Sequence, residues 1–114
     1  MEKIEIIKKN YEFRKVILKG KYYGGRLLGI YILKNYSKKN RIGIAASKKL
    51  GNSVLRNKTK RLIRENYRLI NKDIVSGYDI VFIIKKNTKK ESINFYNIKD
   101  DLKITLLNSK LKEK

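Results

Sequence analysis

The chain has 114 residues, enough for one domain (1–114) with one modest core. It contains 41% hydrophobic residues, which excludes a disordered basic tail, and no cysteine, which excludes disulfides and cysteine-ligated zinc. Its 30 Lys and Arg outnumber its 10 Asp and Glu, which gives a formal net charge of +20. Folding brings these positive charges close together and they repel one another, so we expect a polyanionic partner.

The first expected element is a helix in "NYEFRKVILKG", residues 10–20. Asn10 is a candidate cap, Phe13 and Ile17 lie one turn apart, and Gly20 is the expected stop. Apolar runs at 26–34 and 41–49, separated by "NYSKKN", predict a β-hairpin.

A second helix should begin at a cap formed by Asn52 or Ser53 and run to about Asn71. "YDIVFIIKK" (78–86) is rich in β-branched and aromatic residues and predicts a strand. A last helix should start between Ser92 and Asn97. The strand–helix–strand order predicts that 41–49 and 78–86 lie parallel with the helix across them, which gives an α+β class.

The second helix has two different faces when 100° is assigned to each residue. The predicted packing stripe comprises Leu55, Thr59, Leu62, Ile63, Asn66, Leu69 and Ile70. The opposite side comprises Asn57, Lys60, Arg61, Arg64 and Arg68.

The simplest interpretation of that cationic side is a solvated helix face. However, Lys60, Arg64 and Arg68 stack as like charges at four-residue spacing, which weakens an isolated helix. Four of the six cations between Gly51 and Arg68 are arginine, the side chain suited to bidentate phosphate contacts. We therefore expect this face to contact nucleic acid.

"RIGIAASKKLGNSVLRNKTKRLIRENYR" (41–68) closely resembles the signature of the bacterial ribonuclease P protein subunit. That pattern is a glycine-bearing strand, Ser-Lys-Lys, Gly-Asn-Ala-Val, Arg-Asn-Arg-x-Lys-Arg and a further Arg. The matching positions are Gly43, Ser47, Lys48, Lys49, Gly51, Asn52, Val54, Arg56, Asn57, Lys60, Arg61 and Arg64. The resemblance is looser elsewhere, at Phe13, "YDIVFIIKK" and the final helix.

Two positions depart from the pattern. Ser53 stands where the family usually has Ala, a minor steric change. Lys58 stands where it usually has the second Arg, which keeps the charge but loses a bidentate donor.

The resemblance implies a two-layer sandwich of helices on a four-stranded mixed sheet, in the order α-β-β-β-α-β-α. It also implies a left-handed βαβ crossover, where the common rule favours a right-handed one, and a further short strand near Tyr22 to Arg26.

Catalytic chemistry is not expected on the protein itself. The chain has no His and no Cys, which removes the commonest general base and a thiol nucleophile. A two-metal nuclease needs clustered carboxylates, and the only adjacent acids, Asp100 and Asp101, read as surface charge. The resemblance implies that a catalytic RNA subunit holds magnesium and matures the 5′ end of tRNA.

The resemblance implies two RNA-binding surfaces. One contacts the RNA subunit through Lys48, Lys49, Asn52, Arg56, Asn57, Lys58, Lys60, Arg61, Arg64 and Arg68. The other takes the single-stranded 5′ leader of precursor tRNA in a cleft lined by Phe13, Ile17 and Tyr31, with Arg26 near its mouth.

The alternative for Phe13, Ile17 and Tyr31 is that they are core. Ile17 is aliphatic where the family often has an aromatic, so stacking should be weaker there. Gly29, on the same side of its strand as Tyr31, should leave room for a polynucleotide. Tyr22, Tyr23, Tyr36 and Tyr78 are not assigned to a site.

Three other functions fit the composition. A ribosomal protein would be just as basic, and co-purification with ribosomes would favour it. A transcription factor could use 53–71 as a recognition helix, but no suitable helix immediately precedes it. A self-sufficient nuclease lacks a site. No apolar run could span a bilayer and no signal peptide is evident, so we expect a cytoplasmic protein that needs no protein partner.

Overall fold

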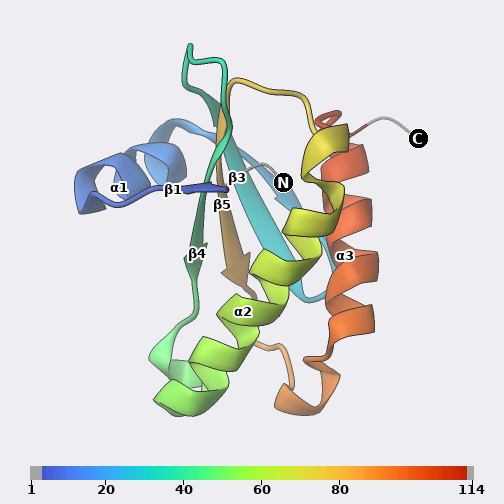
Figure 1. Ribbon diagram of the computed structural model, residues 1–114. Coiled ribbons are helices and arrows are strands. Elements are labelled where there is room, and N and C mark those ends of the chain that lie inside the picture. Colours follow the sequence, from blue (N-terminus) through green and yellow to red (C-terminus); the bar gives the residue numbers. More distant parts are fainter. Residues whose placement is uncertain (1–3, 113–114) are drawn as a thin grey trace.

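The computed structural model describes residues 4–112 and contains one mixed sheet with three helices (Figure 1). The elements are β1 (Glu5–Ile6), α1 (Asn10–Lys19), β2 (Lys21–Gly24), β3 (Leu28–Lys34), β4 (Arg41–Ala45), α2 (Ser53–Ile70), β5 (Tyr78–Ile84) and α3 (Phe95–Asn108). Short 3-10 turns lie at Lys48–Leu50, Asn71–Asp73 and Lys90–Ser92.

The strand order is β1-β4-β5-β3-β2. β4 and β5 are parallel neighbours joined through α2, as the sequence predicted, while β3 pairs antiparallel with both β5 and β2. The predicted hairpin between 26–34 and 41–49 is wrong, because β5 lies between β3 and β4 in the sheet. The α+β class is confirmed, but the sheet has five strands rather than four. The additional strand, β1, has only two residues and pairs parallel with β4, so it is too short to show a periodic pattern.

Helices cover both faces of the sheet, which separates two apolar clusters. In β3, Leu28 and Ile30 are fully buried in the larger cluster with α2 and α3. Tyr31 and Leu33 point to the other face, where they pack with Val16 of α1. Figure 1 shows α1 on the opposite side of the sheet from α2 and α3.

Helix α2 begins as predicted, because the Asn52 side chain accepts a hydrogen bond from the Leu55 N–H at 3.0 Å. Its packing face was partly wrong. Leu69, expected in the stripe, is 68% exposed, whereas Tyr67 is 1% exposed and packs edge-on to Phe82 with ring centroids 5.8 Å apart. Burial raises the pKa of Tyr67 to about 12.

The predicted cap of α1 was also wrong. Asn10 is the first helical residue, and Lys9 occupies the cap position without a side-chain hydrogen bond. The helix ends at Gly20 as expected, where the Gly20 N–H donates to the Val16 carbonyl at 2.8 Å.

Asp101 is not the surface charge that the sequence indicated. It is 2% exposed, and its carboxylate accepts hydrogen bonds from the backbone N–H groups of Arg26, Leu27 and Leu28 at 2.7, 3.0 and 2.7 Å. Its neighbour Asp100 is exposed. Asp101 therefore fastens the β2–β3 turn to α3.

No helix within residues 4–112 is both long enough and apolar enough to cross a membrane.

Candidate nucleic-acid interface

Helix α2 presents most of the predicted cations to solvent. Seven of the predicted residues on α2 and its preceding loop are exposed: Lys49, Asn52, Asn57, Lys58, Arg61, Arg64 and Arg68. Arg56 and Lys60 are partly buried, and Lys48 lies in the turn Lys48–Leu50. We call these ten positions the cationic ridge.

Internal ion pairs neutralise little of the cationic ridge. Glu65 is the sole acid in α2, and its Oε1 lies 3.9 Å from Arg61 Nε, in a pair whose side chains are at least half exposed. An exposed pair of that length contributes little. The ridge thus keeps its positive field.

Arg56 has a hydrogen-bond donor without an acceptor in the described part of the chain. Its Nε is buried and has no hydrogen-bond acceptor among residues 4–112. A buried donor without an acceptor is costly in the isolated protein.

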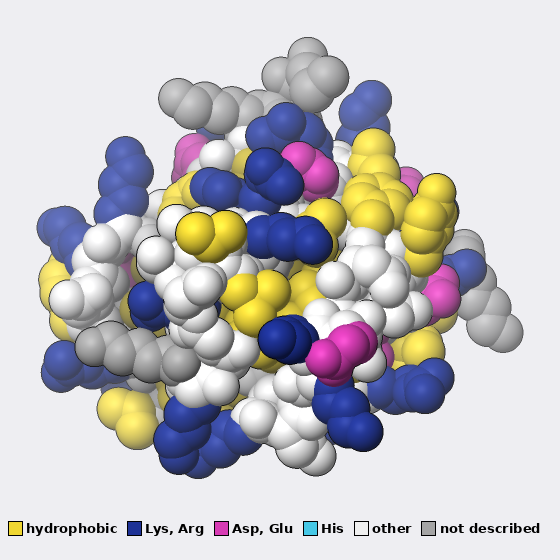
Figure 2. Space-filling model, turned by 90° about the horizontal axis from the view of Figure 1, so that it is seen from below, with side chains coloured by type: hydrophobic (Ala, Val, Ile, Leu, Met, Phe, Trp, Pro, Cys, Tyr) yellow, Lys and Arg dark blue, Asp and Glu magenta, His cyan; other side chains and the backbone are white. Residues whose placement is uncertain are grey.

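The end of the molecule where β4 and β5 finish and α2 begins is densely basic. Figure 2 views the molecule from this end and shows Lys and Arg side chains around the outline, few Asp or Glu, and apolar side chains near the centre. This distribution suits a partner that carries many negative charges.

Three of the predicted leader-binding residues lie together on the sheet face covered by α1. Phe13, Ile17 and Tyr31 are partly buried and pack against the small cluster of Ile7, Val16 and Val81. They are neither fully enclosed core nor free surface. The three side chains that the sequence predicted to line one cleft therefore lie on a common face.

The orientation of α1 on this face is fixed by Arg41 of β4. Its guanidinium donates to Asp79 of β5 at 2.9 and 2.7 Å and to Glu12 of α1 at 2.8 Å. These hydrogen bonds, those to Asp79 first and then that to Glu12, raise the pKa of Arg41 well above its usual value. The sequence analysis missed this residue, because its partners are distant in the chain.

The expected free space above Gly29 is filled. A Cβ at Gly29 would come within 2.5 Å of Cε1 of Tyr22, so the tyrosine ring covers the glycine. Close approach also occurs at Gly43, where a Cβ would lie 2.8 Å from the Phe13 ring. Both glycines therefore make room for aromatic rings of this chain, which contradicts the expectation that Gly29 leaves space for a polynucleotide.

Arg26 lies apart from the other three leader-binding candidates. Its backbone is held by Asp101, and it lines a small cavity of about 130 Å³ with Ser92, Asn97 and Ile104 beside α3. That is the α3 side of the sheet. The structure therefore does not bring Arg26 together with Phe13 and Tyr31.

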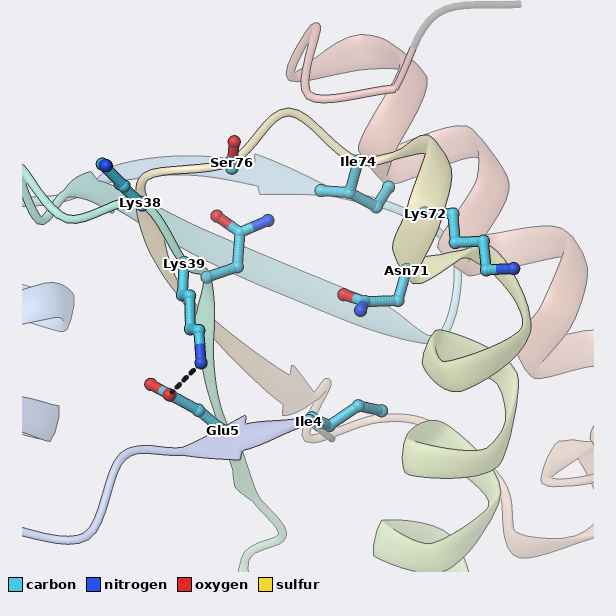
Figure 3. Close-up of a pocket in the computed structure, with 9 residues that line it drawn as sticks. Ile4, Glu5, Lys38, Lys39, Asn71, Lys72, Ile74 and Ser76 are labelled. Carbon is cyan, nitrogen blue, oxygen red and sulfur yellow. Dashed lines mark ion pairs between the residues drawn. The ribbon is translucent and has the colours of Figure 1, made fainter. Parts of the chain in front are cut away.

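A larger cavity lies at the C-terminal end of α2, away from all the predicted site residues. Its volume is about 580 Å³, and Figure 3 shows Lys38, Lys39 and Lys72 around it. Lys39 Nζ is paired with Glu5 Oε1 at 3.5 Å. The cavity adds positive charge at a second end of the molecule but shares no residue with the cationic ridge.

The described residues offer no carboxylate site for a metal ion. Within 4–112, no group of three or more Asp, Glu, His or Cys side chains is placed to hold one.

These features define a small, strongly basic α+β protein with one cationic helix and a partly open aromatic sheet face. The chain belongs to the ribonuclease P protein family, because the family model described as Ribonuclease P matches residues 1–109. It is therefore a component expected within a ribonuclease P enzyme rather than a ribosomal protein or a transcription factor.

Relatives and solved structures agree with that assignment. A ribonuclease P protein component from Clostridium botulinum is 53% identical over 83 residues, covering 72% of this chain and 75% of the relative. One from Clostridium acetobutylicum is 46% identical over 99 residues, covering 85% and 82%.

The fold is shared as well. The ribonuclease P protein of Staphylococcus aureus has a TM-score of 0.86 and 36% identity, covering 97% of this chain and all of that one. The protein from Thermotoga maritima has a TM-score of 0.82 and 28% identity, covering 91% and 96%.

Proposed function

We propose that this chain binds the catalytic RNA of ribonuclease P through the cationic ridge. It also binds the single-stranded 5′ leader of precursor tRNA on the α1 side of the sheet. In this role it assists magnesium-dependent endonucleolytic removal of the leader, while the RNA carries out the chemistry.

The cationic ridge is the observation that supports this proposal most strongly. Seven of its members are exposed, and the ion pair recorded for the ridge among the described residues joins Arg61 to Glu65 at 3.9 Å. The guanidinium group of arginine can donate two hydrogen bonds to phosphate oxygens. Hydrogen bonds between charged partners are stronger than those between neutral groups.

The magnesium belongs to the RNA subunit in this proposal. Mg²⁺ prefers oxygen ligands such as carboxylates, carbonyls and phosphates. The described part of the chain has no cluster of acidic side chains to supply them, whereas RNA carries phosphate oxygens along its length. The protein would contribute cations that lower the repulsion between RNA strands.

The division of labour predicts a clear result in reconstitution. Purified protein should leave precursor tRNA intact at every magnesium concentration, because residues 4–112 hold no cluster of metal-ligating side chains and the sequence has no histidine. Adding the protein to the cognate RNA should raise cleavage at low magnesium, measured as the rate of 5′ leader release. Robust 5′ processing by the protein alone, free of RNA, would refute the proposal.

A second prediction concerns leader binding at Tyr31. In a reconstituted holoenzyme, Tyr31→Ala should weaken precursor tRNA binding by about 1–3 kcal/mol, the usual loss for one stacked base. Binding of mature tRNA should hardly change. The measured quantity is the ratio of the two affinities, which cancels any general loss of charge or folded protein.

Tyr96→Ala is the matched control, since Tyr96 is a 72% exposed tyrosine on α3. It should leave both affinities at the wild-type value. If Tyr31→Ala instead lowers both affinities equally and also lowers thermal stability, Tyr31 is a core residue and the leader is bound elsewhere.

A further inference from the structure

The sheet face under α1 continues beyond the helix as two rows of residues. Strand register places Tyr22, Tyr31, Val81 and Gly43 in one row across β2, β3, β5 and β4. The next row is Gly24, Gly29, Ile83 and Ala45.

Side chains of the second row project little above the sheet, because three of its four members are Gly or Ala. Ile83 and Ala45 are only partly buried, so α1 does not cover this row completely. Aromatic rings stand at two places above the rows: Phe13 over Gly43 of β4, and Tyr22 over Gly29 of β3. The two glycines lie on strands that are separated by β5, so these strands are about 10 Å apart in the sheet.

Tyr22 combines a fixed position with an accessible ring. Its ring centroid lies 4.9 Å from that of Tyr31, with the planes tilted by 52°. It also packs onto Gly29, yet 45% of the residue remains exposed. Gly29 therefore lets the Tyr22 ring lie over β3 while part of the residue stays accessible.

A cation lies next to this ring. A Cβ at Gly24 would be 3.3 Å from the Tyr22 ring and 3.4 Å from Lys85 Nζ, so both side chains converge above Gly24. An accessible aromatic face beside an ammonium group is the combination that binds single-stranded nucleic acid with little sequence preference.

We propose that Tyr22 is a second base-stacking residue of this face, which takes a nucleobase of the single-stranded 5′ leader, while Lys85 contacts the adjacent phosphate. This inference rests on the proposed function. It assigns the leader a path across the sheet from Phe13 to the β2 edge. It also offsets the aliphatic Ile17, because the aromatic missing from α1 is replaced by one on β2.

The test compares Tyr22→Leu, Tyr22→Ala and Tyr22→Phe in the reconstituted holoenzyme. Leucine still covers Gly29 but offers no aromatic face, so it separates stacking from space filling. The substrates are mature tRNA and precursors whose leaders lengthen by one nucleotide at a time. Affinity for each is measured at fixed salt, together with affinity for the RNA subunit.

Tyr22→Leu and Tyr22→Ala should bind long-leader precursors about 5- to 150-fold more weakly, whereas Tyr22→Phe should match the wild type. The loss should begin at one leader length and persist beyond it. Mature tRNA and RNA-subunit affinities should not change. Lys85→Gln should reduce precursor affinity at the same leader lengths and reduce its salt dependence.

Two results would overturn the inference. One is a Tyr22→Leu variant that binds every precursor as the wild type does, which would make Tyr22 a space-filling residue. The other is an equal loss for precursor and mature tRNA. If Tyr31→Ala still weakens precursor binding selectively in these cases, the proposed function stands and only the role of Tyr22 fails. If wild-type holoenzyme does not distinguish precursor from mature tRNA, the proposed function itself fails.

Discussion

Replacing Arg61 and Arg64 with alanine should weaken binding to the RNA subunit by about 1.5–3 kcal/mol for each arginine, the usual worth of a charge-assisted hydrogen bond. Both residues are exposed on α2, so the fold should remain intact. If about six phosphates are neutralised by the ridge, log affinity against log salt should have a slope of roughly −4 to −5 in the wild type, and a shallower one in the variant. The measurement is an equilibrium titration of RNA at several salt concentrations.

Two controls accompany the double variant. Lys99→Ala with Lys103→Ala removes two exposed cations from α3 and should have a much smaller effect on affinity. Ile63→Ala, at a fully buried position of α2, should instead lower the free energy of unfolding by about 2–5 kcal/mol. Unchanged RNA affinity in the Arg61/Arg64 variant would place the RNA contact on another surface.

Asp101→Ala should lower the free energy of unfolding by about 3–5 kcal/mol, because it strips the acceptor from three backbone N–H groups at once. The donors belong to the β2–β3 turn, so β2 should also lose protection from hydrogen exchange. Chemical denaturation gives the free energy, and exchange of the Arg26, Leu27 and Leu28 amides gives the location.

The neighbouring acid provides the control. Asp100→Ala removes the same charge one residue away, at an exposed position, and should change stability by no more than about 0.5 kcal/mol. If Asp101→Ala and Asp100→Ala were equally mild, Asp101 would not hold the turn. Because Arg26 is positioned by Asp101, any effect of Arg26 on substrate binding should also be altered by Asp101→Ala.

Much of the fold follows from periodicity in the sequence. The helix cap at Asn52 and the strand Tyr78–Ile84 were predicted, because each has a strong local signal. Residues at the edge of a helix's buried face have no comparable local sequence signal. Leu69 and Tyr67 flank opposite edges of the packing stripe of α2, and the presence of α3 and Phe82 decides that the tyrosine is the one buried.

Contacts between distant segments were the part that the sequence could not provide. In the sequence alone, Asp101 cannot be distinguished from its exposed neighbour Asp100. Its role becomes visible only when the β2–β3 turn packs against α3. In the sequence alone, Gly29 predicts free space above its strand. The strand register shows that Tyr22 fills this space. In each case, the role of the residue depends on a partner seven or more positions away in the chain.

The candidate site was predicted unevenly for the same reason. Five members of the cationic ridge follow from helical geometry alone, because they lie on one side of α2: Asn57, Lys60, Arg61, Arg64 and Arg68. The other members were named from the resemblance to the family signature. The leader-binding candidates come from α1, the β2–β3 turn and β3, so only the structure separates Arg26 from Phe13 and Tyr31 and brings Tyr22 to their face.

The most direct test of the proposed function is the ratio of precursor to mature tRNA affinity, measured for the cognate RNA subunit with and without this protein. The two substrates differ only in the single-stranded leader, so the ratio isolates what the protein adds to leader binding. We expect the protein to raise the ratio by strengthening precursor binding while leaving mature tRNA affinity nearly unchanged. An identical ratio with and without the protein, in a complex shown to be assembled, would contradict the assignment of this protein to leader recognition.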